Sequence, residues 1–161
     1  MSYFYYIKNL QNGDVLSAGS GSPEPGKPLY LEPLIRPRVN YQLWHIDNPA
    51  SSYIKLVGSD LVLRKETSGP PGAYWVRLAA PDNSPAQFWS YNHDVSRITN
   101  VGSGLMLNFT NILYNFKIVT CSQPIDSEDS APNGEATQNV VTAGVNAFAW
   151  QLQIAGDNDP E

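Results

Sequence analysis

A short aromatic motif occurs three times in this chain of 161 residues and constrains its fold more than any other feature. Gln42-Leu43-Trp44 returns as Gln87-Phe88-Trp89 and, with the glutamine replaced, as Phe148-Ala149-Trp150. The tryptophans lie 45 and then 61 residues apart (89 minus 44, and 150 minus 89). A tryptophan at the same place in three similar segments indicates three copies of one unit, none of which could bury its apolar face alone.

Each copy has the pattern of four short β-strands separated by turns. The strand candidates are runs rich in aromatic and β-branched residues. Asn12-Gly13 is the strongest hairpin signal, because both residues tolerate a positive φ. We expect repeats at about 3–48, 52–93 and 95–155, with the third interrupted at 122–144 by a long acidic surface loop. The expected strands cover 5–9, 15–16, 29–32, 42–46, 53–57, 61–63, 74–78, 87–89, 97–101, 105–107, 116–120 and 148–150.

The composition supports a single all-β domain over residues 1–161. Hydrophobic residues make up 42% of the chain, which is enough for a substantial core. Glycine and proline together number 25 (12 plus 13), and no window has an apolar stripe of helical period. The three repeats therefore predict about twelve strands around a pseudo-threefold axis, with one tryptophan from each repeat in a shared core.

Charge and terminal sequence exclude several classes of function. The net charge of -5 argues against nucleic acid and anionic membranes as main partners. Residues 1–8 have neither the basic region nor the apolar core of a signal peptide or membrane span, so we expect a cytoplasmic protein without membrane insertion. The single cysteine, Cys121, excludes an internal disulfide. Asn108-Phe109-Thr110 matches the glycosylation sequon, but we do not expect its use without secretion.

The repeated motif resembles that of the ricin-B-like β-trefoil family, whose three four-stranded units each end in Gln-x-Trp. The resemblance extends from Tyr3 to Ile154 and rests on two intact motifs and on the similar openings of the repeats. It implies a β-trefoil with pseudo-threefold symmetry. The chain is also similar to small fungal ricin-B-like lectins, which implies a stand-alone binder of glycans or glycoproteins with a role in defence.

The resemblance also implies where sugars would bind in each repeat. The family uses an acidic residue after the second strand, an aromatic on the third strand and an asparagine before the motif glutamine. A sugar offers hydroxyls on its rim and a C–H face that an aromatic ring can cover. Glu32 and Arg77 take the third-strand position in repeats one and two, and no repeat has the complete galactose-type set. The acidic position is held by Ser17, Arg64 and Asn108, and the position before the glutamine or its replacement by Tyr41, Ala86 and Ala147.

Repeat two offers the first candidate surface. Trp75 is the one tryptophan outside the repeated motif, and by a period of two it shares a strand face with Arg77. Arg64 and Arg77 would favour an acidic or multiply hydroxylated ligand through their planar guanidinium groups. The alternative is a satellite apolar cluster under the Pro70-Pro71 loop. The predicted ligand-binding residues of this repeat are Arg64, Trp75, Arg77, Asp82 and Asn83.

Repeats one and three offer further candidates. Tyr30 and Glu32 share a strand face near Asn40 and Tyr41, which would form a polar cup, although a solvated strand edge is the alternative. Asn108 is the closest substitute for the acidic residue in repeat three, because an amide both donates and accepts hydrogen bonds. The alternative for this asparagine-rich stretch is turn formation.

Catalysis has little support in the sequence, and a protease inhibitor is the rival binding function. His45 and His93 lie a full repeat apart without metal-ligand spacing, so we expect no enzyme, metal or cofactor. The β-trefoil also carries protease inhibitors, and a fold alone does not select between functions. Lys27 within 18–28, or Arg36 before Pro37, could enter a trypsin-like pocket, and the segment 19–26 could enter a cysteine-protease cleft. Partners would then be glycans or a protease, and a homodimer is compatible with the sequence.

Overall fold

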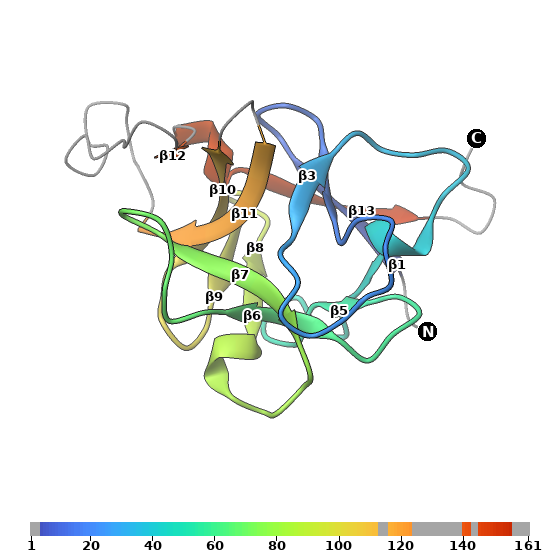
Figure 1. The fold of residues 1–161 in the computed structure, drawn as a ribbon, viewed down its shortest axis with the longest axis horizontal. Coiled ribbons are helices and arrows are strands. Elements are labelled where there is room, and N and C mark those ends of the chain that lie inside the picture. The colour runs from blue at the N-terminus through green and yellow to red at the C-terminus, as the bar shows by residue number, and fades with distance from the viewer. Residues whose placement is uncertain (1–3, 113–115, 124–139, 143–144, 156–161) are drawn as a thin grey trace.

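The computed structural model describes residues 4–112, 116–123, 140–142 and 145–155, which form a thirteen-stranded antiparallel sheet and three short 3₁₀ helices (Figure 1). The helices are η1 (Asn40–Gln42), η2 (Pro85–Gln87) and η4 (Val145–Phe148). The strands are β1 (Phe4–Asn9), β2 (Val15–Ser17), β3 (Tyr30–Glu32), β4 (Trp44–His45), β5 (Lys55–Leu56), β6 (Val62–Lys65), β7 (Tyr74–Ala79), β8 (Trp89–Asn92), β9 (Arg97–Asn100), β10 (Met106–Ile112), β11 (Phe116–Ser122), β12 (Val140–Thr142) and β13 (Trp150–Ala155).

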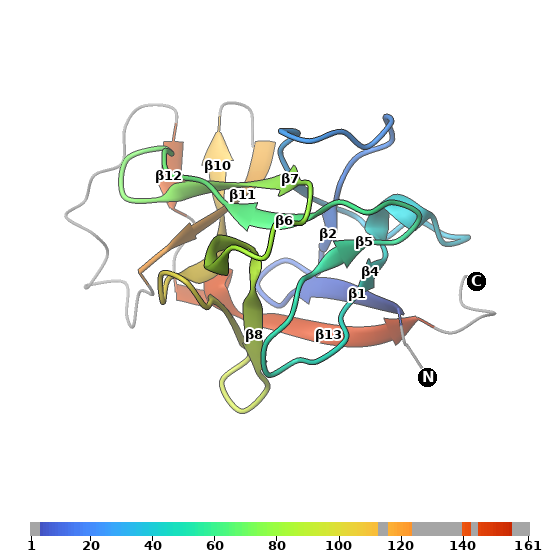
Figure 2. The same cartoon turned by 90° about the horizontal axis from the view of Figure 1, so that it is seen from below.

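The strands form three hairpins over a barrel. The second and third strands of each repeat pair as β2–β3, β6–β7 and β10–β11. The first and fourth strands pair around the barrel, and β1 meets β13 along its whole length. Figure 2 shows β8 and β13 on the opposite side of the molecule from β6 and β7. The turn at Asn12-Gly13 joins β1 to β2 as expected, and Gly13 has the positive φ of 78° that favours glycine.

The third strands of the three hairpins meet around one axis, as β3 (blue), β7 (green) and β11 (orange) show in Figure 1. Each hairpin pairs with the next along its third strand, and one residue pair recurs at equivalent positions in all three contacts. The three pairs are Pro28 with Arg77, Trp75 with Thr120, and Ile118 with Tyr30. One contact repeated three times defines a pseudo-threefold axis and confirms the predicted β-trefoil.

The repeated tryptophans are structural. Trp44, Trp89 and Trp150 lie in the core and are at most 2% exposed. In each repeat the indole Nε1–H donates to a main-chain carbonyl of the second strand. The acceptors are Leu16, Leu63 and Leu107, at 3.0, 3.1 and 2.9 Å. Each indole thus buries a large apolar area while its one polar group stays satisfied.

The motif glutamines hold the loop that follows the third strand. Gln42 Oε1 accepts from the Ile35 amide at 2.9 Å, and its Nε2 donates to the Pro33 carbonyl at 3.0 Å. Gln87 makes the same two bonds, to Asp82 and Ala80. The expected strands at 42–46 and 87–89 therefore begin later than predicted, because each glutamine ends a 3₁₀ turn that directs its amide at this loop. Phe148 replaces the glutamine in repeat three and is fully buried in the core.

Repeat three differs from expectation in the segment 122–144. β11 extends through Ser122, and residues 140–142 form an additional strand, β12, that pairs with β10. The described strands therefore number thirteen rather than about twelve. The rest of the predicted acidic loop, at 124–139 and 143–144, lies outside the described residues. No helix in the described part of the chain is long and apolar enough to cross a membrane.

Trp89→Phe is expected to lower the free energy of unfolding by about 2–4 kcal/mol, because it removes a buried hydrogen bond, orphans the Leu63 carbonyl and leaves a small cavity. Urea unfolding followed by circular dichroism measures the effect. Trp75→Phe is the control, since Trp75 is only half-buried and lies outside the core cluster, and it should change the free energy by less than about 1 kcal/mol. Equal losses in the two variants would contradict a special structural role for the repeated tryptophans.

Cys121 is expected to resist alkylation in the folded protein. Burial raises the pKa of its thiol from the ordinary 9.0 to about 12, with a smaller opposing effect from the Lys65 charge. The buried thiol thus stays protonated below that pKa. Because its pKa is higher in the folded state than in the unfolded state, the thiol contributes to the free energy of unfolding fully below pH 9, and this contribution is lost as the pH rises towards 12. Iodoacetamide at pH 8 should modify only urea-unfolded protein in a mass-spectrometric assay. Rapid modification of native protein would contradict the burial.

Candidate functional site

The hairpin cap is the face of hairpins β2–β3, β6–β7 and β10–β11 that points away from the core. Strand register defines one equivalent pair of positions in each hairpin. The pairs are Ser17 with Tyr30, Arg64 with Arg77, and Asn108 with Thr120. Their neighbours Leu31, Leu78 and Cys121 are buried, so the pairs themselves lie on the opposite sheet face.

This register corrects one assignment made from the sequence. Glu32 and Arg77 were expected at equivalent third-strand positions, but Glu32 pairs with Val15 whereas Arg77 pairs with Arg64. Arg77 therefore corresponds to Tyr30, and Glu32 corresponds to Ala79, the partner of Val62. A shift of two residues keeps every side chain on its own face, so an alternating pattern cannot reveal it.

Repeat one places a carboxylate beside a hydroxyl on the hairpin cap. Ser17 Oγ donates to Glu32 Oε1 at 2.5 Å and accepts from the Gly19 amide at 3.1 Å. Tyr30 and Tyr41 are half-buried, and the Ala18 amide donates to the Tyr41 carbonyl at 2.9 Å, which draws η1 towards the hairpin. Four of the five residues predicted or considered for this repeat are therefore brought together.

Asn40, the fifth residue, contacts a different element. It is exposed at the start of η1, and a Cβ placed on Gly58 would lie 3.4 Å from its Nδ2. The Asn40 side chain thus packs beside the turn between β5 and β6. This contact arises between repeats, which is why proximity to the motif in the sequence did not show it.

Repeat two places a tryptophan and two arginines in one row. The Arg77 guanidinium lies over the Trp75 ring, 5.7 Å from its centroid. Arg64 stands opposite Arg77 on β6, and its Nε lies 3.8 Å from Glu66 Oε2. All three predicted residues are half-buried, so Trp75 is neither in the core nor fully exposed. An aromatic surface with guanidinium groups beside it can bind a planar or hydroxylated ligand.

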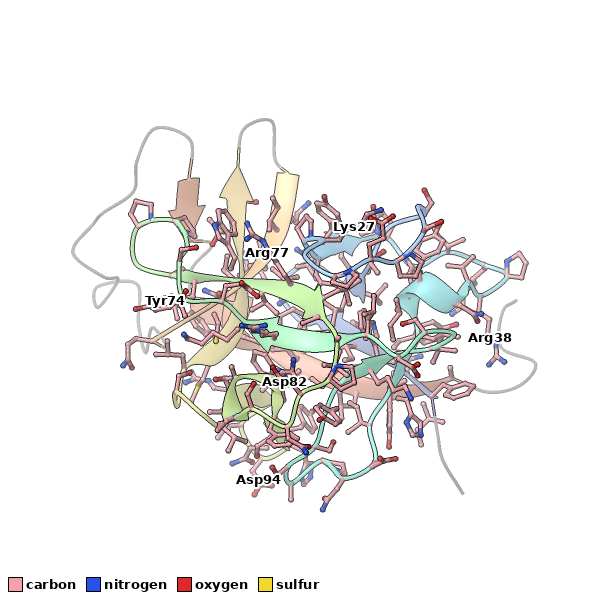
Figure 3. All side chains as sticks on the ribbon, turned by 60° about the horizontal axis from the view of Figure 1, so that its bottom comes forward. Lys27, Arg38, Tyr74, Arg77, Asp82 and Asp94 are labelled. Carbon is pink, nitrogen blue, oxygen red and sulfur yellow. The ribbon has the colours of Figure 1, made fainter. Side chains whose placement is uncertain are left out.

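Asp82 and Asn83 lie in the loop after β7, and Figure 3 shows Asp82 and Arg77 on either side of the β6–β7 hairpin. Hydrogen bonds from Ser84 lower the pKa of Asp82, and the Arg64 charge contributes less. Asp82 Oδ1 accepts from the Ser84 amide at 2.9 Å within its own loop. Asn83 Oδ1 accepts from the Tyr53 hydroxyl at 3.0 Å, which binds this side chain to the segment before β5.

Repeat three is closed by its own hydrogen bonds. Asn108 is 0% exposed; its Oδ1 accepts from Thr120 Oγ1 at 2.7 Å and its Nδ2 donates to Ser122 Oγ at 3.2 Å. Thr110 and Thr120 share a further bond of 2.8 Å. The predicted contact between Asn108 and a ligand is thus not available in this conformation. The same burial makes the sequon at Asn108 inaccessible in the folded chain.

A groove of about 620 Å³, which no feature of the sequence predicted, lies beside β4 and β5. The Phe4 ring packs edge-on against His45, with centroids 6.2 Å apart, and Lys55 forms an ion pair with Asp60 at 3.6 Å. Register carries Phe4, His45 and Lys55 across three adjacent strands, a relation that no spacing in the sequence signals. The groove is lined by Phe4, His45, Lys55, Leu56, Val57, Gly58, Ser59 and Asp60.

The loops considered for protease inhibition are tied to the body of the protein. The Lys27 carbonyl accepts from the Leu78 amide at 3.0 Å, and Lys27 Nζ donates to the Ser22 carbonyl at 2.8 Å. The loop containing Arg36 is fastened at Ile35 by Gln42. Among the described residues, no group of three or more histidine, cysteine or acidic side chains could hold a metal ion.

Comparisons with known proteins agree with the fold. No family model matches the sequence, and no curated protein matches it. A mutant of the earthworm lectin C-terminal domain in complex with 6'-sialyllactose superposes with a TM-score of 0.66 at 17% identity, covering 94% of this chain and 98% of that one. The designed threefold-symmetric protein ThreeFoil gives 0.66 at 12% identity, covering 93% and 97%. The Polyporus squamosus lectin bound to Neu5Aca2-6Galb1-4GlcNAc gives 0.63 at 14% identity, covering 95% of this chain and 49% of that one. At these identities the likeness establishes a β-trefoil fold.

Proposed function

We propose that the protein is a non-catalytic lectin that binds glycans without a metal through shallow sites on the hairpin cap. The observation that carries the proposal is Trp75, a half-buried tryptophan on the cap that the repeated core does not use. A partly exposed tryptophan can cover the apolar face of a sugar ring. Arg64 and Arg77 beside it supply donors for the hydroxyls.

Similarity to glycan-bound structures supports this proposal. The earthworm lectin domain and the Polyporus squamosus lectin both superpose on this chain with bound oligosaccharides. The Gln-x-Trp repeats and these neighbours together favour a ricin-B-like lectin over the other functions that a β-trefoil can carry. We do not propose protease inhibition, because the glycan-bound neighbours favour a lectin and no described loop favours an inhibitor.

The three repeats are unequal as sites. Repeat two has Trp75 beside Arg64 and Arg77. Repeat one has Tyr30 and Glu32, and the Glu32 carboxylate accepts a hydrogen bond from the Ser17 hydroxyl. Repeat three has its equivalent polar side chains buried and bonded to one another. We therefore propose two sites, which a multivalent glycan could occupy together with a gain in avidity.

Trp75→Ala is expected to weaken glycan binding by roughly tenfold or more, because it removes the ring that covers the sugar face. A glycan array followed by titration calorimetry on the strongest neutral and acidic hits measures the loss. Tyr74→Ala is the matched control: it removes an aromatic from the same strand, but from the opposite sheet face.

The array also locates the site and can reject the function. Binding that survives Trp75→Ala but falls in Glu32→Gln would assign the main site to repeat one. No binding by well-folded wild-type protein on a broad array would refute the lectin proposal. An equal loss in Trp75→Ala and Tyr74→Ala would argue against a site on the cap face of β7.

A further inference from the structure

Hairpin β6–β7 places two arginines directly opposite each other. Arg64 and Arg77 are cross-strand partners, so their Cβ atoms lie about 5 Å apart on one sheet face. Like charges at directly opposed positions destabilise a hairpin. The chain as a whole has a net charge of -5, so the overall composition does not account for two cations side by side.

Only one of these two cations has an acidic partner among the described residues. Arg64 Nε lies 3.8 Å from Glu66 Oε2, whereas Arg77 contacts the Trp75 ring and has no described carboxylate within salt-bridge distance. Arg77 is nevertheless half-buried, where an unpaired charge is less well solvated than on an open surface. A planar guanidinium in this state favours a carboxylate or sulfate, which it can bind with two parallel hydrogen bonds.

The fold does not require this basic pair. The equivalent positions hold Ser17 with Tyr30 in repeat one and Asn108 with Thr120 in repeat three. Both of these pairs are uncharged, and each supports the same hairpin geometry. The two arginines are therefore a property of repeat two alone, at the surface where Trp75 also lies.

We infer that the β6–β7 face of the hairpin cap selects acidic saccharides. The Arg77 guanidinium holds the carboxylate or sulfate of the sugar, the open part of the Trp75 ring contacts the sugar's apolar face, and Arg64 adds positive charge from the opposite strand. This inference rests on the proposed glycan-binding function and adds the charge class of the ligand and the residues that select it.

The test compares ligands that differ in charge. Wild-type protein is titrated by calorimetry with lactose, sialyllactose, sulfated lactose and inorganic sulfate at low ionic strength. We expect the two acidic saccharides to bind at least roughly tenfold more tightly than lactose, with a difference that shrinks as salt screens the charge. Arg77→Gln should abolish this preference by lowering the affinity for the two acidic saccharides to that for lactose. Arg77→Lys should keep only part of the preference for acidic saccharides, because an ammonium group lacks the planar geometry that allows two parallel hydrogen bonds.

Arg38→Gln is the matched control, since it makes the same charge change at a position that Figure 3 shows far from Arg77. It should leave the preference intact, and an equal loss in this variant would overturn the inference by showing an effect of net charge alone. If inorganic sulfate binds as tightly as the acidic saccharides, the inference is overturned, because the site would then recognise an anion without recognising a sugar. Lactose binding without any acidic preference would overturn the inference and leave the lectin proposal standing, whereas no binding of any saccharide would overturn both.

Discussion

The hydrogen bond from each core indole to the second strand of its own repeat is the interaction on which the rest of the structure depends. It is made three times with almost the same length, by Trp44, Trp89 and Trp150. The bond fixes the start of the fourth strand against the second, and the indole ring fills the space beneath the hairpin. Because the ring is buried and its N–H satisfied, hairpin and barrel pack as one core. The outer face of each hairpin is then free to vary, and that is where the three repeats differ.

The architecture could be predicted because it depends on the threefold repeat and on the two-residue alternation of the strands. Three tryptophans with similar flanks indicated three units, and the Asn12-Gly13 turn and alternating strands located most elements. The errors have local physical causes. The glutamines lie in 3₁₀ turns because their amides hold a loop, which the strand pattern does not show. β12 was missed because its pairing with β10 joins segments about thirty residues apart through a stretch without strand signals.

The candidate site was less predictable than the fold. Trp75 stood out as the tryptophan that the repeats did not need, and the structure places it with Arg77 as expected. Asn108 resembled a ligand-binding amide in composition, but whether an amide faces solvent or a threonine is decided by packing across β10 and β11. Asn40 packs beside the turn after β5 in the next repeat, and the groove at Phe4 and His45 is lined by residues of both repeats. The residue types at such places can be read from the sequence, but the register between distant strands decides which of them meet.

The pairing of β1 with β13 has a consequence for how the chain acquires its structure. Phe4 pairs with Ala155, 151 positions later (155 minus 4), so the barrel closes through contacts that span almost the whole described chain. Closing so long a loop has a high entropic cost before any contact compensates it, and such topologies fold slowly. During synthesis β1 leaves the ribosome with only β2 and β4 as early neighbours, and one of its edges stays unpaired until β13 emerges. That exposed edge presents unpaired main-chain N–H and C=O groups, and it is the place where a nascent chain of this kind would meet a chaperone or another copy of itself.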